Sequence, residues 1–159
     1  MIKGAVAKDL FALLAEDRRA GAYAADDAHL RAGAPDAFGG WVEVRSEALE
    51  AGAILAALKA GHYYSSQGPE IHAVEVGEGS VAVRCLPARG VLLAGRSTAR
   101  ARALGEDIVE CELPLAAFAG SYFGVTVMDA AGRRARTNPV WLDRGQGQRS
   151  RSLAPQAVR

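Results

Sequence analysis

The segment IHAVEVGEGSVAVRCL, residues 71–86, decides how this chain folds. Its two halves, Ile71–Val76 and Val81–Leu86, largely alternate apolar and polar residues, which is typical of strands with one buried face. Between them, the sequence Gly77-Glu78-Gly79-Ser80 is typical of a tight hairpin turn. The segment therefore predicts two neighbouring strands joined by a short turn.

Further strand-like runs continue this pattern up to residue 142. They are separated by Gly, Pro and Asp turns, and they are Val91–Ala94, Ile108–Leu113, Tyr122–Met128 and Arg134–Leu142. Six such strands at this spacing predict a small antiparallel β-sandwich over residues 70–142. Residues 143–159 are polar and have little to bury, so we expect a disordered tail there.

Residues 1–69 instead predict an α/β layer in which helices and strands alternate. Apolar residues at helical spacing predict one helix over Val6–Arg19 and another over Glu47–Ala60, the second capped by Ser46 and ended by Gly61. The apolar runs Ala22–Ala25 and Trp41–Val44 predict two short strands. The whole chain is therefore expected to belong to the α+β class.

Composition excludes several classes of protein. A net charge of +1 argues against a general nucleic-acid-binding surface, because such surfaces carry a clear cationic excess. Cys85 and Cys111 lack the Cys-x-x-Cys spacing of a ribbon-type zinc site, and we expect both to be ordinary buried thiols. No run approaches the roughly 20 apolar residues of a membrane span, nor is there a signal-peptide core, so we expect a cytoplasmic protein without a membrane partner.

The sequence Asp26-Asp27-Ala28-His29 directly follows the first predicted strand. A carboxylate and an imidazole two residues apart at a strand end can converge on one divalent cation, and α/β folds commonly place ligand-binding groups there. Asp27 and His29 are therefore candidate metal ligands. The alternative is structural, with a turn-capping aspartate and a partly exposed histidine, since Asp-x-His pairs are common by chance.

Three sequence blocks in order carry a resemblance to a known family. They are DDAH (residues 26–29), PDAFGGW (35–41) and AILAALKAGHYYSSQGPEI (53–71), and DAAGRRARTNPVWL (129–142) adds a closing block. Together they resemble the C-terminal portion of PHP-domain (polymerase and histidinol phosphatase) metal-dependent phosphoesterases that carry a β-rich C-terminal extension. By this resemblance, residues 1–69 are a C-terminal remnant of a PHP-like α/β barrel, followed by the β-sandwich extension.

The resemblance implies metal-dependent phosphoester hydrolysis. PHP proteins are similar to distorted (β/α)₇ barrels whose strand ends hold up to three divalent ions, usually zinc, manganese or iron, and these ions activate a water for attack on the phosphoester. Asp27 and His29 match the last Asp-x-His motif of the family. Asp27 would contribute a carboxylate oxygen and His29 an imidazole nitrogen, while Asp26 would orient the site.

The chain departs from the family pattern at its N-terminal motifs. The opening His-x-His motif and the ligands from the middle of the barrel have no counterpart, and His62 and His72 lie beyond the last motif. Two ligands leave a metal site short of its normal coordination, so we expect weak metal binding and no activity of this chain alone. The resemblance therefore implies a truncated enzyme that the missing N-terminal barrel segment or a second copy would complete.

A non-catalytic binding or structural β-sandwich module, with a relic metal motif, is the alternative hypothesis. An enzyme part predicts exposed apolar surface on the first 69 residues, where the barrel would continue. The module predicts a self-contained core and no tightly bound metal.

Two further segments allow both a functional and a structural interpretation. The loop Tyr63–Pro69 could meet a phosphate, but a helix-to-strand connector is the simpler interpretation. The arginines Arg96, Arg100 and Arg102 could bind an anion, although a solvated loop is expected. Arg133, Arg134 and Arg136 follow the hairpin signal DAAG (residues 129–132) and are expected to face solvent.

Overall fold

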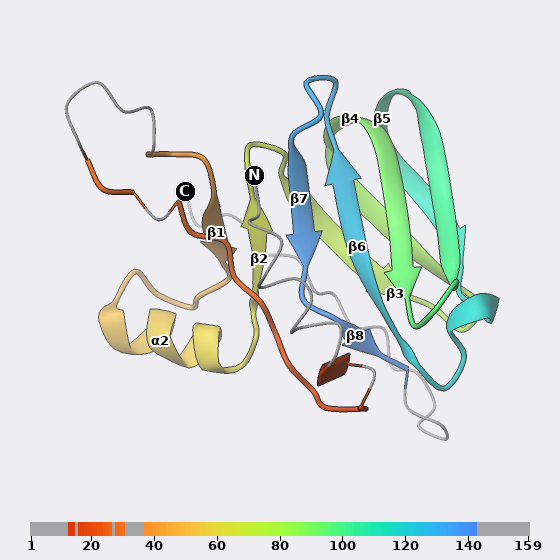
Figure 1. Cartoon of the computed structure of the whole chain (residues 1–159), viewed down its shortest axis with the longest axis horizontal. Helices are drawn as coiled ribbons and strands as arrows, with labels where there is room; N and C mark the ends of the chain where they lie inside the picture. Colours follow the sequence, from red (N-terminus) through yellow and green to blue (C-terminus); the bar gives the residue numbers. More distant parts are fainter. Residues whose placement is uncertain (1–12, 15, 27, 31–36, 143–159) are drawn as a thin grey trace.

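The computed structural model describes residues 13–14, 16–26, 28–30 and 37–142. This part of the chain is mostly β: one curled antiparallel sheet with a single short α-helix, α2 (Ala51–Lys59), near its β1 end (Figure 1). The strands are β1 (Trp41–Val44), β2 (Tyr63–Ser66), β3 (Ile71–Val76), β4 (Ser80–Gly95), β5 (Arg100–Pro114), β6 (Tyr122–Met128), β7 (Arg134–Thr137) and β8 (Val140–Trp141). None of the helices in the described part is long and apolar enough to cross a membrane.

The strands follow the order β1-β2-β7-β6-β4-β3, with β5 also paired to β4 and β8 to β6. Strand β4 is the longest element, and its two halves have different neighbours. Its first half lies between β3 and β5, whereas its second half lies between β6 and β5. We call the region around the first half the first wall and the region around the second half the second wall.

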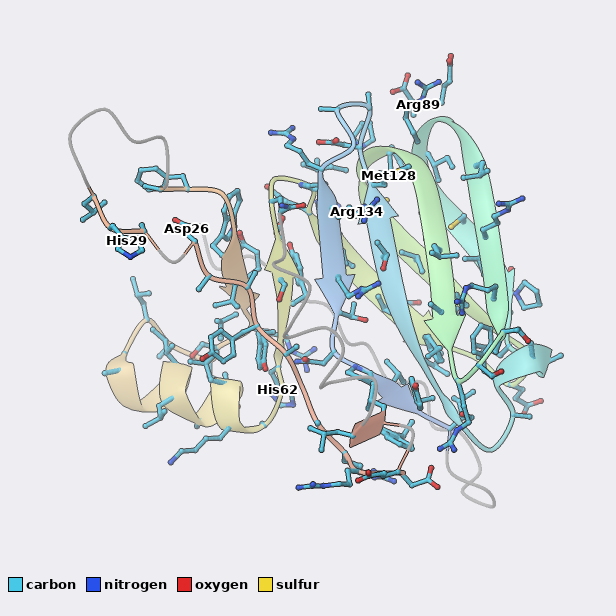
Figure 2. The ribbon with its side chains drawn as sticks, in the orientation of Figure 1. Asp26, His29, His62, Arg89, Met128 and Arg134 are labelled. Carbon is cyan, nitrogen blue, oxygen red and sulfur yellow. The ribbon has the colours of Figure 1, made fainter. Side chains whose placement is uncertain are left out.

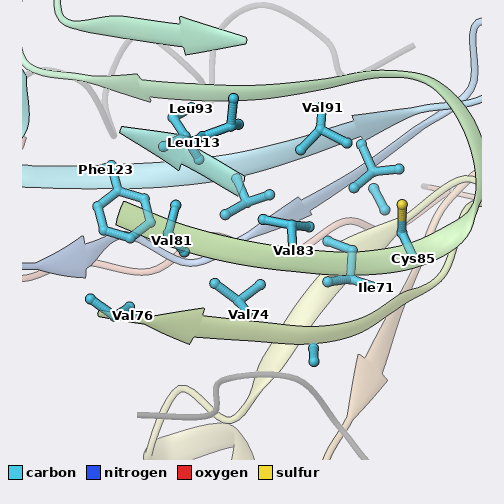
Figure 3. Packing of buried hydrophobic residues seen from close by; sticks show 14 of the residues in the cluster. Ile71, Val74, Val76, Val81, Val83, Cys85, Val91, Leu93, Leu113 and Phe123 are labelled. Atoms are coloured by element: carbon cyan, nitrogen blue, oxygen red, sulfur yellow. The ribbon is translucent and has the colours of Figure 1, made fainter. Parts of the chain in front are cut away.

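The register of the β4–β5 ribbon shifts between Arg84 and Ala88 and again between Ala88 and Gly90. Such bulges bend a sheet, and here the bend lets the two walls face each other. The side chains of Val81 and Val83 point across the core toward those of Val91 and Leu93 (Figure 3). Each of these four side chains is fully buried, which contributes about 1.5–3 kcal/mol for a residue of this kind.

The β-rich, antiparallel architecture predicted for residues 70–142 is confirmed. Strands β3 and β6 have the predicted bounds, and the predicted hairpin closes with the Gly77 N–H donating to the Ser80 carbonyl at 2.9 Å. All described strands belong to one hydrogen-bonded sheet that curls around a single core. The two runs predicted on either side of Pro87 are parts of one strand, β4, because the bulges carry the ladder past the proline.

Strand β2 corrects the interpretation of residues 63–69 as a connector. It pairs with β1 on one side and with β7 on the other, so hydrogen bonds of one sheet cross the boundary expected at residue 69. The Tyr64 hydroxyl accepts the Ile71 N–H at 3.2 Å, and the Ser66 hydroxyl donates to the Pro69 carbonyl at 2.7 Å. These buried contacts fix the turn between β2 and β3.

The described part of residues 1–69 shows no α/β barrel. The strand predicted over Ala22–Ala25 is wrong: the segment has no ladder partner, and its Ala22 N–H instead donates to the Asn138 side chain at 3.1 Å. Most of the helix predicted over residues 6–19 lies outside the described residues, as does the tail predicted over residues 143–159. Leu13 and Leu14 are helical, and Leu14 is buried.

Helix α2 begins later than predicted. Its N-cap is Glu50, and Ser46 does not cap it, because the Ser46 hydroxyl donates to the Ala48 carbonyl within a bend that precedes the helix. The predicted end is confirmed: Gly61 has a φ of +75° and follows the C-cap Ala60.

Candidate functional site

Asp26 anchors the segment that carries the candidate metal ligands. Its Oδ2 accepts the Phe38 N–H at 2.5 Å, and its Oδ1 accepts the Gly40 N–H at 2.7 Å. Both carboxylate oxygens are therefore engaged by backbone donors just before β1. Hydrogen bonds to an ionised carboxylate are stronger than neutral ones, so this contact ties two parts of the loop together.

The structure describes only one of the two predicted ligands. Asp27 lies outside the described residues, and His29 is exposed in the segment Ala28–Leu30 (Figure 2). Within the described ranges, no three His, Cys, Asp or Glu side chains converge in a way that could hold a metal ion. Of the two predicted ligands, the structure therefore places His29 alone, three residues after the anchored Asp26.

The other two histidines belong to different elements. His62 follows α2, where its N–H donates to the Ala57 carbonyl at 2.9 Å and its carbonyl accepts the Arg45 N–H at 2.9 Å. His72 lies on the exposed face of β3, with its Nε2 3.5 Å from a carboxylate oxygen of Glu70. Both positions are explained by local contacts.

Large apolar side chains are exposed on the part of the chain that precedes β2. Phe38 and Leu49 are 89% and 92% exposed, and the set also contains Tyr23, Leu30 and Leu55. We call these five residues the exposed apolar set. Leu30 directly follows His29 in the sequence, and Phe38 is one of the two residues whose N–H binds Asp26. Exposed apolar side chains therefore lie close to His29 along the chain.

The remaining chemistry-bearing groups are structural. Burial raises the pKa of the Cys85 thiol to about 11, and burial followed by the charge of Glu110 raises the pKa of Cys111. Both cysteines are free thiols; Cys85 is buried as predicted, whereas Cys111 is only half-buried. Burial also raises the pKa of Tyr64 to about 12, which keeps its hydroxyl neutral where it accepts the Ile71 N–H.

An open hollow lies where the β4–β5 bend meets the β6–β7 hairpin, lined by Arg89, Leu104, Met128 and Asp129 among others. Its charged groups are already paired: Arg89 with Glu106 at 3.3 Å, and Asp129 with Arg133 at 2.7 Å. The hollow therefore presents neither a free nucleophile nor a free acid–base pair.

Comparison with protein-family models, with curated proteins and with solved structures finds no match to this chain. Any function of the chain therefore rests on its own residues and on the contacts described above.

Proposed function

We propose that this chain is the C-terminal part of a metal-dependent phosphoesterase of the PHP type, with Asp27 and His29 as two ligands of its metal ions. The observation that carries the proposal is the double hydrogen bond of Asp26 to Phe38 and Gly40. Metal ligands need supporting contacts that fix their orientation. Asp26 directly precedes Asp27, so its two hydrogen bonds anchor the backbone at the start of the segment that carries both candidate ligands.

The exposed apolar set supports an incomplete enzyme rather than an independent one. Covering these five side chains with a further segment of protein would remove their apolar surface from water, which is favourable. Tyr23 and Leu30 flank the candidate ligands in sequence and are 73% and 80% exposed. A further barrel segment covering this region would bury these side chains and enclose the metal site.

The donor types of the two candidate ligands suit the proposed metals. Imidazole nitrogen and carboxylate oxygen bind zinc, manganese and iron, and a bound ion would act as a Lewis acid and generate hydroxide from water. Two protein ligands are fewer than a zinc site normally holds, so the fit is partial. The remaining ligands would come from the N-terminal barrel segment or from a second copy, and this chain alone would be inactive as a phosphoesterase.

Paramagnetic manganese tests the ligand assignment even if binding is weak. The chain has three histidines, His29, His62 and His72, so their imidazole NMR signals can be followed separately. Titration of Mn²⁺ into the ¹⁵N-labelled chain should broaden the His29 signals at a lower metal concentration than those of the other two histidines.

Asp27→Asn should remove the preference for His29, because it removes the second ligand. His72→Gln is the matched control, since it removes an exposed histidine from β3 and should leave the broadening of His29 unchanged. Equal broadening of all three histidines, or a preference for His29 that survives Asp27→Asn, would contradict the assignment.

A non-catalytic β-sheet module is the second candidate, and the core favours it. The buried cluster runs from Tyr64 to Ala135 and draws on both walls, so the main core is built from residues that follow β1 and α2. A ligand that binds only the folded state raises the melting midpoint. The module hypothesis expects the same midpoint in Mn²⁺ and in chelator, whereas the phosphoesterase hypothesis expects a higher midpoint in Mn²⁺ that Asp27→Asn abolishes.

A further inference from the structure

The outer face of the second wall collects four arginines from two distant parts of the sequence. Arg100 and Arg102 come from β5, and Arg134 and Arg136 come from β7. Residues directly opposite each other in paired strands project from the same face of a sheet. One register row runs from Arg102 through Leu92 and Thr126 to Arg136 and Ser65. We call this face the basic wall.

The arginines of the basic wall differ from other arginines of the chain in their partners. Within the described residues none of the four forms an ion pair, whereas Arg84 pairs with Glu75 at 2.9 Å and Arg133 pairs with Asp129 at 2.7 Å. Arg134 and Arg136 are two residues apart on β7 and so share a face; burial, and after it the charge of Arg134, lowers the pKa of Arg136. The basic wall is therefore a region of uncompensated positive charge.

Among the described residues, glutamates outnumber arginine on the outer face of the first wall, where Arg84 pairs with Glu75 at 2.9 Å and leaves the other glutamates without a basic partner on that face. Glu75 and Glu112 lie in one register row, on either side of Ala82, and Glu110 lies in the next row, opposite Arg84. Glu78 adds a carboxylate at the β3–β4 turn, and all four glutamates are exposed. We call this face the acidic wall.

The two charged walls face away from each other. Val81 and Val83 on the inner side of the first wall meet Val91 and Leu93 on the inner side of the second, with the core between them (Figure 3). The outer faces therefore point in opposite directions. Across the sheet, Arg102 and Arg136 are three strand spacings apart, about 14 Å, and Glu75 and Glu112 are two spacings apart, about 10 Å. Arginine and glutamate side chains are long enough to make up the difference between the spacing on one wall and the spacing on the other.

We propose that copies of this chain associate head to tail, with the basic wall of one copy against the acidic wall of the next. A second copy fits better than a nucleic acid, because both complementary surfaces are present on one chain whose net charge is only +1. The register row of the basic wall also lacks the aromatic side chains on which bases stack. Since the two surfaces differ, the contact does not close into a two-fold dimer, and association continues from copy to copy.

Sedimentation velocity over a series of protein concentrations and salt concentrations tests this association. Exposed ion pairs are individually weak. Charges interact over roughly one Debye length, which is about 30 Å at 0.01 M salt and about 3 Å at 1 M, so high salt suppresses their attraction. The weight-average sedimentation coefficient should therefore rise with protein concentration at low salt and stay constant at high salt. A coefficient that is constant at low salt as well would overturn the proposal.

Charge reversal then identifies the surfaces. Arg100→Glu/Arg102→Glu/Arg134→Glu makes both walls acidic, and Glu78→Arg/Glu110→Arg/Glu112→Arg makes both walls basic. Each variant alone should lose self-association, and an equimolar mixture of the two should regain it. The control Arg18→Glu/Lys59→Glu/Arg89→Glu has the same net charge as the first variant but changes exposed residues outside the basic wall, so it should associate more strongly than that variant.

Failure of the mixture to associate, or equal loss of association in the control, would overturn the assignment of the walls. A second outcome would also overturn the proposal: the wild-type chain is monomeric but binds single-stranded DNA, and the arginine reversals abolish that binding. The partner of the basic wall would then be a polyanion and not a second copy. Circular dichroism of each variant confirms that a loss of association does not come from unfolding. The result is independent of the phosphoesterase proposal, because neither wall contains Asp27 or His29.

Discussion

The carboxylate of Asp26 accepts the backbone N–H of Gly40 at 2.7 Å, across 14 positions of the sequence. Its other oxygen accepts the N–H of Phe38. One side chain therefore closes the loop that contains both candidate metal ligands, and Gly40 leads directly into β1.

Asp26→Ala should open the loop without unfolding the sheet. Charge-assisted hydrogen bonds contribute about 1.5–3 kcal/mol each when protected, and solvent screening at this partly exposed site reduces the loss to about 1 kcal/mol in total. Hydrogen exchange measured by NMR should show faster exchange of the Phe38 and Gly40 amides, while core amides of β4 and β6 stay protected. The control Glu47→Ala, at an exposed position before α2, should leave both loop amides unchanged.

Gly95→Ala should strongly destabilise the fold. An added Cβ would overlap the Tyr122 carbonyl oxygen and lie 2.7 Å from Phe118 Cδ1, where the end of β4 packs closely on its neighbours. Overpacking of a buried site costs about 1–3 kcal/mol, which urea denaturation would detect as a lower free energy of unfolding.

The matched control is Gly52→Ala in α2, where an added Cβ would meet nothing within 4 Å. Alanine is a better helix former than glycine by roughly 1 kcal/mol, so this variant should be equally or more stable than the wild type. If both variants lost the same free energy of unfolding, the close contacts around Gly95 would not explain the loss in Gly95→Ala.

Much of the fold could be predicted from local pattern, and the failures have physical causes. The strand over residues 71–76 and the hairpin after it follow from alternation and turn residues, which are local signals. The run at residues 22–25 has the apolar composition of a strand but pairs with nothing, since its backbone is bound by the Asn138 side chain from far along the sequence. Strand β2 does not follow from local pattern, because Tyr63-Tyr64-Ser65-Ser66 does not alternate apolar and polar residues, although the burial of its side chains alternates in the structure.

The arrangement of the candidate site was less predictable than the fold. The sequence predicts Asp26 as an orienting residue but not its partners, Phe38 and Gly40, because the loop between them has no periodic pattern. The basic wall was missed for a related reason. Arg102 and Arg136 share a register row only through the pairing of four strands, and that register is a non-local property.

Acid should selectively weaken the β6–β7 hairpin through Asp129. Burial of this carboxyl opposes its ionisation, but hydrogen bonds from the Arg133 side chain and backbone and from the Ala131 N–H outweigh that effect and lower its pKa. A lowered folded-state pKa contributes stability that is present above the unfolded value of about 3.8 and is lost as pH falls through the folded-state pKa.

Asp129→Asn should therefore destabilise the chain by about 1 kcal/mol at neutral pH, where the ionised carboxylate is lost. Its stability should then match that of the wild type more closely as pH falls below the unfolded pKa. Thermal melts of both chains across the acidic range would show this convergence, and parallel curves with a constant gap would contradict the role given to the carboxylate.

Cys85 should react slowly with thiol reagents until the chain unfolds. Burial and then the neighbouring Cys111 raise its pKa to about 11, so at pH 8 it is a protonated, inaccessible thiol. Because the folded-state pKa is raised, the associated stability is present below the unfolded value of 9.0 and is lost as pH rises toward 11. Labelling with Ellman's reagent at pH 8 should modify Cys111 before Cys85, with Cys111→Ser as the variant that isolates the slow site.

The most direct test of the phosphoesterase proposal is to determine the nucleotide sequence immediately upstream of the Met1 codon and to read it in all three forward frames. We expect an open reading frame that continues into this chain and encodes a His-x-His motif followed by further His and Glu residues with the spacing of barrel ligands. A frame closed by a stop codon, with no such motif in any frame, would contradict the claim that this chain is part of a larger metallophosphoesterase.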